Sequence, residues 1–563
     1  MPPQWQLAFV KQNITWDWRG SLNYRQDADN RIGFIIDDRF TSNLLIHRFN
    51  QKKWRDENHL NAFIFTGMDY GTFGVYLESW ALNDRQAGTN SLFNNHAAGL
   101  KSINYLTNNI FIKPYVGYQQ AGNKSYIDWG WDLGMQADLS DFYLGDYRTS
   151  FNVASDMDLF PGRKNYAHQF DLRIHKQFSS VARDSMWVHY DISKQQYYSQ
   201  IPGTLVNVDL ESRYLRNILV YDLTRRSFFQ LNTLFNSRRV ADNTPDNANI
   251  RDVFRFENRF GYRFFATDFR FYLGFNTFRE TLDNIDIRTD SEALQTGIQS
   301  DFSFIFSRND QLDVQLNYIK FQYDTPSLEE NDDRDEVRFI GLIRYAHRFS
   351  DLLDLQLDAY GNLYHRMYIY KAQSANNSWN RIYKLQSTVN YNNGDWRNAL
   401  RTQVLANYTV YDFDHLFKDT RSYIFRKYAV SDSLIFPILY QLQGGAYVRL
   451  ELEDRGTYYK EDFSQFVSES SQILFYDVFL KKRGVLRLDM EVGFAVYHRR
   501  NWRHIPVSVT SRDIRRVSPY IRLVYPLGRN LKFLSQISRN FVDDKGREKS
   551  EYMFGRMDLQ YYF

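Results

Sequence analysis

The stretch that decides the fold reads LDLQLDAYGNLY and covers residues 353–364. Apolar residues such as Leu355 and Leu357 alternate there with polar residues such as Asp354 and Asp358. Successive side chains of a β-strand point to opposite faces of the sheet. The pattern therefore predicts a strand with one apolar face and one polar face.

The same alternation recurs along the chain, at residues 269–276, 312–318 and 486–497. Several of these runs reach about ten residues. A strand of a soluble domain usually has about five or six residues. A strand that crosses a bilayer at a tilt needs roughly 9–11 residues. The length of the runs therefore favours strands that span a membrane.

Short and long polar connections alternate between the runs. Short turns are expected at residues 26–30, 106–109, 137–141, 223–226, 266–268, 307–310, 392–395 and 527–530. Long loops are expected at residues 38–59, 81–98, 241–249, 281–292, 324–336, 412–432, 454–470 and 542–551. An up-and-down barrel with turns at one rim and loops at the other gives this order.

We therefore predict an all-β fold, a single large antiparallel up-and-down transmembrane β-barrel that covers residues 1–563. The number of connections indicates about 26 strands, within a range of about 22–28. Residues 1–14 are expected to form either an N-terminal periplasmic segment or the first strand.

Composition excludes several classes of protein. The chain has 563 residues, 17% of them aromatic, with no Cys and a formal net charge of +4. So many aromatic residues argue against a disordered chain. Without Cys there is no disulfide framework, no cysteine zinc site and no covalent haem attachment. The near-balanced charge gives no electrostatic case for nucleic-acid binding.

The last residues of the chain read EYMFGRMDLQYYF, and Leu559, Tyr561 and Phe563 share one face. This ending resembles the terminal strand of bacterial outer-membrane β-barrel proteins, which typically end in Phe after alternating apolar residues. The resemblance implies a large porin-like barrel in the cell outer membrane. It also implies that the barrel-assembly machinery is a partner, with Phe563, Tyr561 and Leu559 as the assembly signal.

The start of the chain lacks the basic and apolar regions of a signal peptide. We therefore expect a mature form from which the signal has been removed. Alternation typical of strands begins by Thr15, which argues against a plug domain inside this chain.

Charged residues occupy the polar positions of several predicted strands, and we expect them to face the lumen. They are Arg255, Glu257, Arg259, Arg263, Asp354, Asp358, Arg487, Asp489 and Glu491. One hypothesis is a cationic stripe at residues 255–263 that selects anions. The other is ion pairing that fills and stiffens the lumen. Pairing is favoured, because positive and negative charges nearly cancel along the chain.

The acidic residues 329–336 raise the question of a calcium site. They lack the spacing and the central Gly of an EF-hand loop, so a solvated external loop is favoured. No nucleophile elbow, zinc-protease motif or Gly-rich phosphate loop is present. The sequence therefore predicts no enzyme, no cofactor and no metal site.

Two functions remain open. The first is a porin-like pore for solutes, because barrels beyond about 16 strands enclose an aqueous lumen unless something fills it. The alternative is a sheath that holds a partner protein, as in porin–cytochrome conduits or export complexes. Outer-membrane lipid is a partner in both cases, and the sheath adds a periplasmic or lumen-bound protein.

Overall fold

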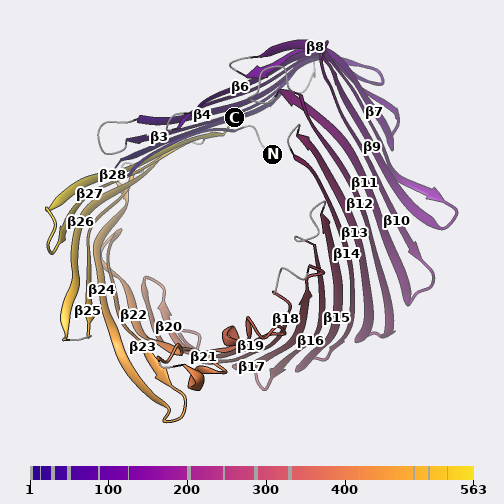
Figure 1. Ribbon diagram of the computed structural model, residues 1–563. Coiled ribbons are helices and arrows are strands. Elements are labelled where there is room, and N and C mark those ends of the chain that lie inside the picture. Colours follow the sequence, from indigo (N-terminus) through magenta and orange to yellow (C-terminus); the bar gives the residue numbers. More distant parts are fainter. Residues whose placement is uncertain are drawn as a thin grey trace.

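The computed structural model describes residues 4–12, 14–26, 32–46, 52–86, 89–123, 126–198, 205–244, 247–284, 290–327, 332–417, 419–485, 488–504, 507–528 and 530–562. They form one sheet of 28 strands, in which every strand pairs antiparallel with the next. The first strand pairs with the last, from Gln4 opposite Tyr562 to Gln12 opposite Phe554, so the sheet closes into a barrel. Figure 1 shows the resulting ring.

The strands of the first half are β1 (Gln4–Gln12), β2 (Thr15–Gln26), β3 (Gly33–Ile46), β4 (Lys52–Met68), β5 (Gly71–Gln86), β6 (Thr89–Thr107), β7 (Ile110–Asn123), β8 (Ile127–Leu144), β9 (Tyr147–Leu159), β10 (Lys164–Gln177), β11 (Ala182–Tyr198), β12 (Leu205–Thr224), β13 (Ser227–Thr244) and β14 (Asn247–Phe265). Those of the second half are β15 (Phe269–Asn284), β16 (Ser291–Ile305), β17 (Asp310–Asp324), β18 (Arg334–Ser350), β19 (Leu353–Tyr368), β20 (Ser378–Asn393), β21 (Trp396–Tyr411), β22 (Tyr423–Leu439), β23 (Leu442–Tyr459), β24 (Ser464–Val485), β25 (Leu488–Arg503), β26 (Val509–Leu527), β27 (Leu531–Asp544) and β28 (Ser550–Tyr562).

The predicted all-β up-and-down barrel is confirmed, and its strand number lies at the top of the expected range. Within the described ranges the helical structure consists of two short 3₁₀ turns, η2 (Ser374–Asn376) and η3 (Asp414–Leu416). No helix in this part of the chain is long and apolar enough to cross a membrane.

Five of the predicted short turns lie at the rim that holds the two chain ends. Turns predicted at residues 106–109, 223–226, 266–268, 307–310 and 392–395 all lie between consecutive strands at this rim. In the turn at residues 307–310, the Asp310 carboxylate accepts hydrogen bonds from Ser307 Oγ and Tyr345 Oη and contacts His347 Nδ1. These hydrogen bonds, first the one from Ser307, lower the pKa of Asp310 to about 2.

Several predicted connections are wrong, because strands run further than expected. The turn expected at residues 137–141 lies inside β8, which continues to Leu144 through a register shift between Leu139 and Phe142. The loops expected at 38–59, 81–98 and 454–470 consist mostly of strand. The strands reach up to 22 residues, far beyond the roughly 9–11 that a bilayer requires. Outside the membrane both faces of a strand meet water, so a polar segment there does not indicate a loop.

Glycines mark the place where the wall turns sharply at β8 (Figure 1). Tyr76 on β5, Gly99 on β6, Gly117 on β7 and Asp132 on β8 are successive partners in register. The Tyr76 ring spans both glycines, and its Oη donates a 2.6 Å hydrogen bond to Asp132. A Cβ at Gly117 would lie 2.1 Å from that Oη, so glycine is required for this close approach.

Candidate functional site

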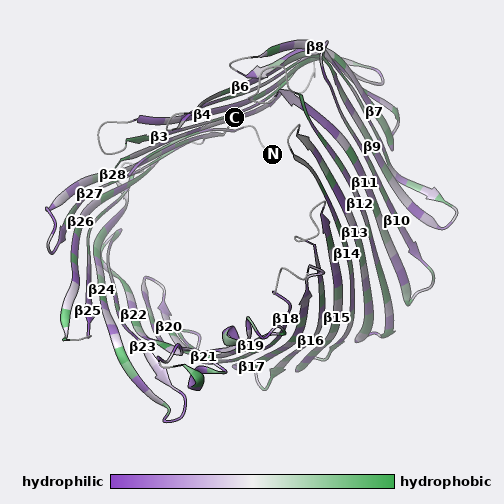
Figure 2. Cartoon of the chain, in the orientation of Figure 1, coloured by the Kyte–Doolittle hydropathy of each residue, from purple (hydrophilic) through white to green (hydrophobic). Residues whose placement is uncertain are grey.

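The two faces of the wall differ in polarity. On one face of β19 and β25, apolar side chains such as Leu357 and Val492 are more than two-fifths exposed. On the other face, Asp358 and Glu491 are less than one-tenth exposed and engaged by cations. Figure 2 shows hydrophilic and hydrophobic residues interspersed along the strands. We assign the apolar face to lipid and the polar face to the lumen, because hydrocarbon disfavours charge.

The charged stripe on β14 is held by ion pairs at its centre. Glu257, which is 8% exposed, contacts Arg255 at 3.2 Å and also pairs with Arg259. A second contact of 3.8 Å joins Arg255 to Glu280 on β15. Arg263 lies over the rings of Phe228 and Tyr272. Three of the four predicted charges thus form one ion-pair cluster.

On β19 the two predicted acids have different partners. Asp358 accepts a 2.8 Å hydrogen bond from Arg344 Nε on β18 and two from the Gln356 amide. Asp354 accepts a 2.8 Å hydrogen bond from Asn390 on β20. The acid with the cation partner is the more buried, which limits the cost of its desolvation.

On β25, Glu491 accepts a 2.9 Å hydrogen bond from Arg522 on β26 and lies 3.8 Å from Lys481 on β24. The backbone N–H of Gly484 donates to Asp489 at 3.0 Å. Arg487, which was also expected to face the lumen, lies outside the described residues.

A lumen-facing row that sequence analysis did not single out consists of Arg173 on β10, Trp187 on β11 and Arg216 on β12. Unlike the β14 stripe, Arg216 has no acid two residues before or after it on its own strand. The sequence alone therefore indicates that Arg216 has no acidic partner at the neighbouring lumen positions of its own strand.

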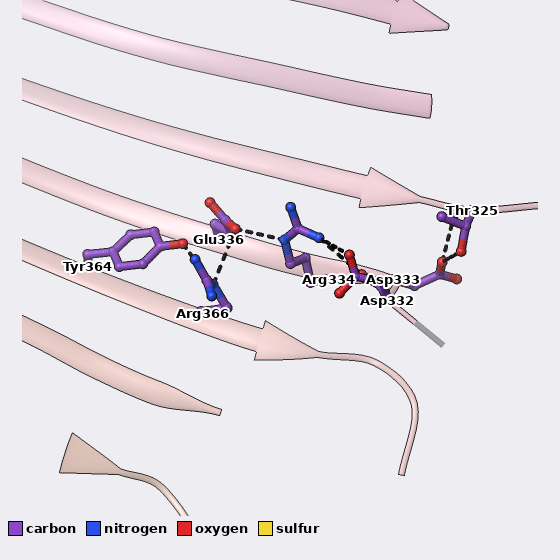
Figure 3. Close-up of polar contacts among 7 residues, drawn as sticks. All are labelled: Thr325, Asp332, Asp333, Arg334, Glu336, Tyr364 and Arg366. Carbon is purple, nitrogen blue, oxygen red and sulfur yellow. Dashed lines mark hydrogen bonds and ion pairs between the residues drawn. The ribbon is translucent and has the colours of Figure 1, made fainter. Parts of the chain in front are cut away.

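The acidic segment 329–336 is partly described, from Asp332 onward. Figure 3 shows that two arginines and Thr325 contact the carboxylates of Asp332, Asp333 and Glu336. Arg334 bridges Asp332 at 2.5 Å and Glu336 at 2.9 Å, and Asp333 accepts hydrogen bonds from the Thr325 backbone N–H and Oγ1. Among the side chains described here, no group of three or more His, Asp or Glu residues is placed to hold a metal ion.

Two residues of the predicted assembly signal, Leu559 and Tyr561, lie in the closing strand, β28. Leu559 is opposite Leu7 on β1 and Phe533 on β27, and Tyr561 is opposite Trp5 and Leu531. Both residues therefore belong to the strand that joins the two ends of the sheet. Phe563 lies outside the described residues.

Comparison with known proteins identifies similar solved structures but no sequence family. No protein-family model and no curated protein matches the chain. The siderophore receptor PirA from Pseudomonas aeruginosa is 8% identical over 77% of each chain, with a TM-score of 0.39. The FrpB iron transporter from Neisseria meningitidis is 10% identical over 77% of this chain and 80% of its own, with a TM-score of 0.41. FpvA from P. aeruginosa is 9% identical over all of this chain and 71% of its own, with a TM-score of 0.43.

The wall itself identifies the class of protein. A closed sheet leaves no strand edge, so the backbone polar groups of each strand find their partners on neighbouring strands of the wall. An apolar outer face, short turns at the rim of the chain ends and a terminal strand that closes the sheet complete the description. The chain is a closed antiparallel β-barrel with the construction of a membrane-spanning wall.

Proposed function

We propose that the barrel is a pore through which small water-soluble solutes cross the outer membrane. The polar inner face carries the proposal, because charged and hydrogen-bonded side chains favour water in the lumen. Barrels of 16–18 strands already leave an aqueous channel, and this wall has 28. Throughout the described ranges the residues belong to the wall or to the connections between its strands.

Conductance of the purified full-length protein in a planar lipid bilayer tests the proposal. We expect stepwise increases in current as single barrels insert, and swelling of proteoliposomes in small neutral sugars. The control is the same preparation unfolded by heating in detergent. Inserted, folded protein with no current and no sugar uptake would overturn the pore.

The width of the barrel also supports a second candidate function, a sheath that holds a partner protein. A 28-stranded barrel is wider than a small solute requires, and it has room for a polypeptide. Purification from native membranes in mild detergent distinguishes the two. A periplasmic protein or lipoprotein recovered in equal amount, together with a barrel that conducts only after its removal, would favour the sheath.

A further inference from the structure

Two arginines flank a tryptophan in one row of the lumen wall. Trp187 is directly opposite Arg173 on one side and Arg216 on the other. Adjacent strands lie about 4.8 Å apart, so the three side chains emerge from the wall as close neighbours. The Arg173 guanidinium lies 5.5 Å from the centre of the Trp187 ring.

These two arginines have no carboxylate partner among the described residues, unlike Arg344 or Arg522 elsewhere on the wall. Asp171 is the acid nearest to Arg173 in the sequence. Its carboxylate instead accepts hydrogen bonds from Trp187 Nε1 at 3.0 Å and from Gln169. It also contacts His189 Nδ1 at 3.0 Å. Arg216 donates to the neutral Asn232 at 3.1 Å.

A cavity of about 410 Å³ lies over this row, close to the rim that holds the chain ends. Its lining includes Trp187, Arg173 and Arg216, together with Arg148, which forms an ion pair with Asp141. His175 also lines it and contacts Ser185 Oγ at 2.9 Å. The volume falls in the range of ordinary small-molecule sites. Because neither Arg173 nor Arg216 has a carboxylate partner in the described part of the chain, the local excess of positive charge favours an anion.

We propose that this cavity is a binding site for small organic anions with a flat apolar body, such as an aromatic carboxylate. The arginines hold the carboxylate by charge-assisted hydrogen bonds, and the indole provides an aromatic surface for the body of the solute. The site deepens the proposed function and rests on it, because a solute reaches the cavity through the lumen.

Isothermal titration calorimetry of the folded full-length barrel in detergent tests the site independently of conductance. The probe is benzoate. Benzyl alcohol has the same body without the charge, and inorganic phosphate has charge without the body. We expect benzoate to bind more tightly than either comparator. Added NaCl should weaken benzoate binding and leave benzyl alcohol unaffected, because salt screens the arginines.

Arg173→Gln and Arg216→Gln should each weaken benzoate binding about tenfold, the loss of one charge-assisted hydrogen bond. The matched control is Arg238→Gln, which removes an exposed arginine from the polar face of β13 further from that rim. The control should bind benzoate as the unmodified protein does. If a variant fails to fold, the salt dependence of the unmodified protein still tests the role of charge.

Benzoate affinity no greater than that of benzyl alcohol would overturn the site, as would equal losses in the control and the two variants. If phosphate bound as tightly as benzoate, the proposed role of the Trp187 indole in holding the apolar body of the solute would be wrong. A barrel that conducts without binding benzoate contradicts the site alone. A barrel that binds benzoate without conducting contradicts the pore alone.

Discussion

Leu357 and Asp358 are neighbours in the chain but lie on opposite sides of the wall. Leu357 is 43% exposed on the apolar face, whereas Asp358 is 9% exposed and bonded to Arg344. Hydrocarbon and a hydrogen-bonded lumen wall tolerate different side chains, so the effect of a substitution depends on the face it lies on. Depth in the membrane is nearly the same for both, and only the face differs.

Leu357→Arg should reduce the folded fraction strongly. An arginine on the lipid face near the middle of the bilayer costs about 2–4 kcal/mol. Folding into lipid vesicles, followed by the heat-dependent shift of the band on a gel, measures the loss.

The matched control is Asp358→Asn, which keeps the shape of the side chain and removes its charge. It should retain most of the folded fraction, because the amide oxygen still accepts from Arg344. Equal losses at both positions would show that β19 does not cross the membrane at this depth.

Among elements, the aromatic bridges over glycine hold neighbouring strands together. Tyr115 on β7 is opposite Gly134 on β8, which is opposite Asp156 on β9. The tyrosine hydroxyl donates a 2.7 Å hydrogen bond to Asp156 across the glycine. One side chain thus links three strands at the bend of the wall.

Gly134→Ala should destabilise the barrel, because its Cβ would lie 2.3 Å from the Tyr115 ring. Tyr115→Ala should lower the free energy of unfolding much less in the Gly134→Ala protein than in the unmodified protein. The coupling energy between the two substitutions should be about 1 kcal/mol or more. Unfolding in guanidinium chloride gives the free energy of unfolding of the unmodified protein, of each single variant and of the double variant.

Gly361→Ala serves as the control, since nothing lies within 4 Å of a Cβ there. It should leave the unfolding midpoint unchanged or slightly raised. Additive effects at Gly134 and Tyr115 would contradict the bridge.

Sequence patterns predicted the elements better where the two faces of a strand meet different media. The alternation of β19 and the turn at residues 307–310 were both readable. The strand ends of β3 and β4 were not, because water on both sides removes the alternation and leaves a polar segment. The number of strands was therefore closer to correct than their lengths.

Partners of the lumen charges were predictable only along one strand. Glu257 stands two residues from Arg255 and from Arg259, so their pairing could be anticipated. The row of Arg173, Trp187 and Arg216 depends on the register between three strands. A one-residue shift in that register would place different residues side by side, and the pattern of a single strand does not show which residues of the next strand are its partners.

For the whole molecule, closure depends on the contact between the first and last strands. Nine register pairs join β1 to β28, from Gln4 opposite Tyr562 to Gln12 opposite Phe554. Without this contact, both edges of the sheet would expose unpaired backbone groups to hydrocarbon.

A disulfide tests closure directly, because the natural chain contains no Cys. Leu7→Cys combined with Leu559→Cys places two thiols at directly opposed positions of β1 and β28. Opposed Cβ atoms on antiparallel strands lie about 4.5–5.5 Å apart, close to disulfide geometry. Mild oxidation of the folded protein should give a cross-linked band of altered mobility under denaturing, non-reducing conditions.

The control pairs Leu7→Cys with Met553→Cys, which lies six residues before Leu559 on the same face of β28. It should not cross-link. Equal yields in the two proteins would contradict the register of the closing strands.

The shortness of β1 has a mechanical consequence. Its nine residues make it the shortest strand of the described wall, and it has nine register pairs on each side, whereas β11 and β12 share 17. Under a pulling force, two strands joined by fewer register pairs separate at a lower force. A barrel stretched between anchor points around its circumference should therefore tear along β1, and the rest of the sheet should unroll from that line.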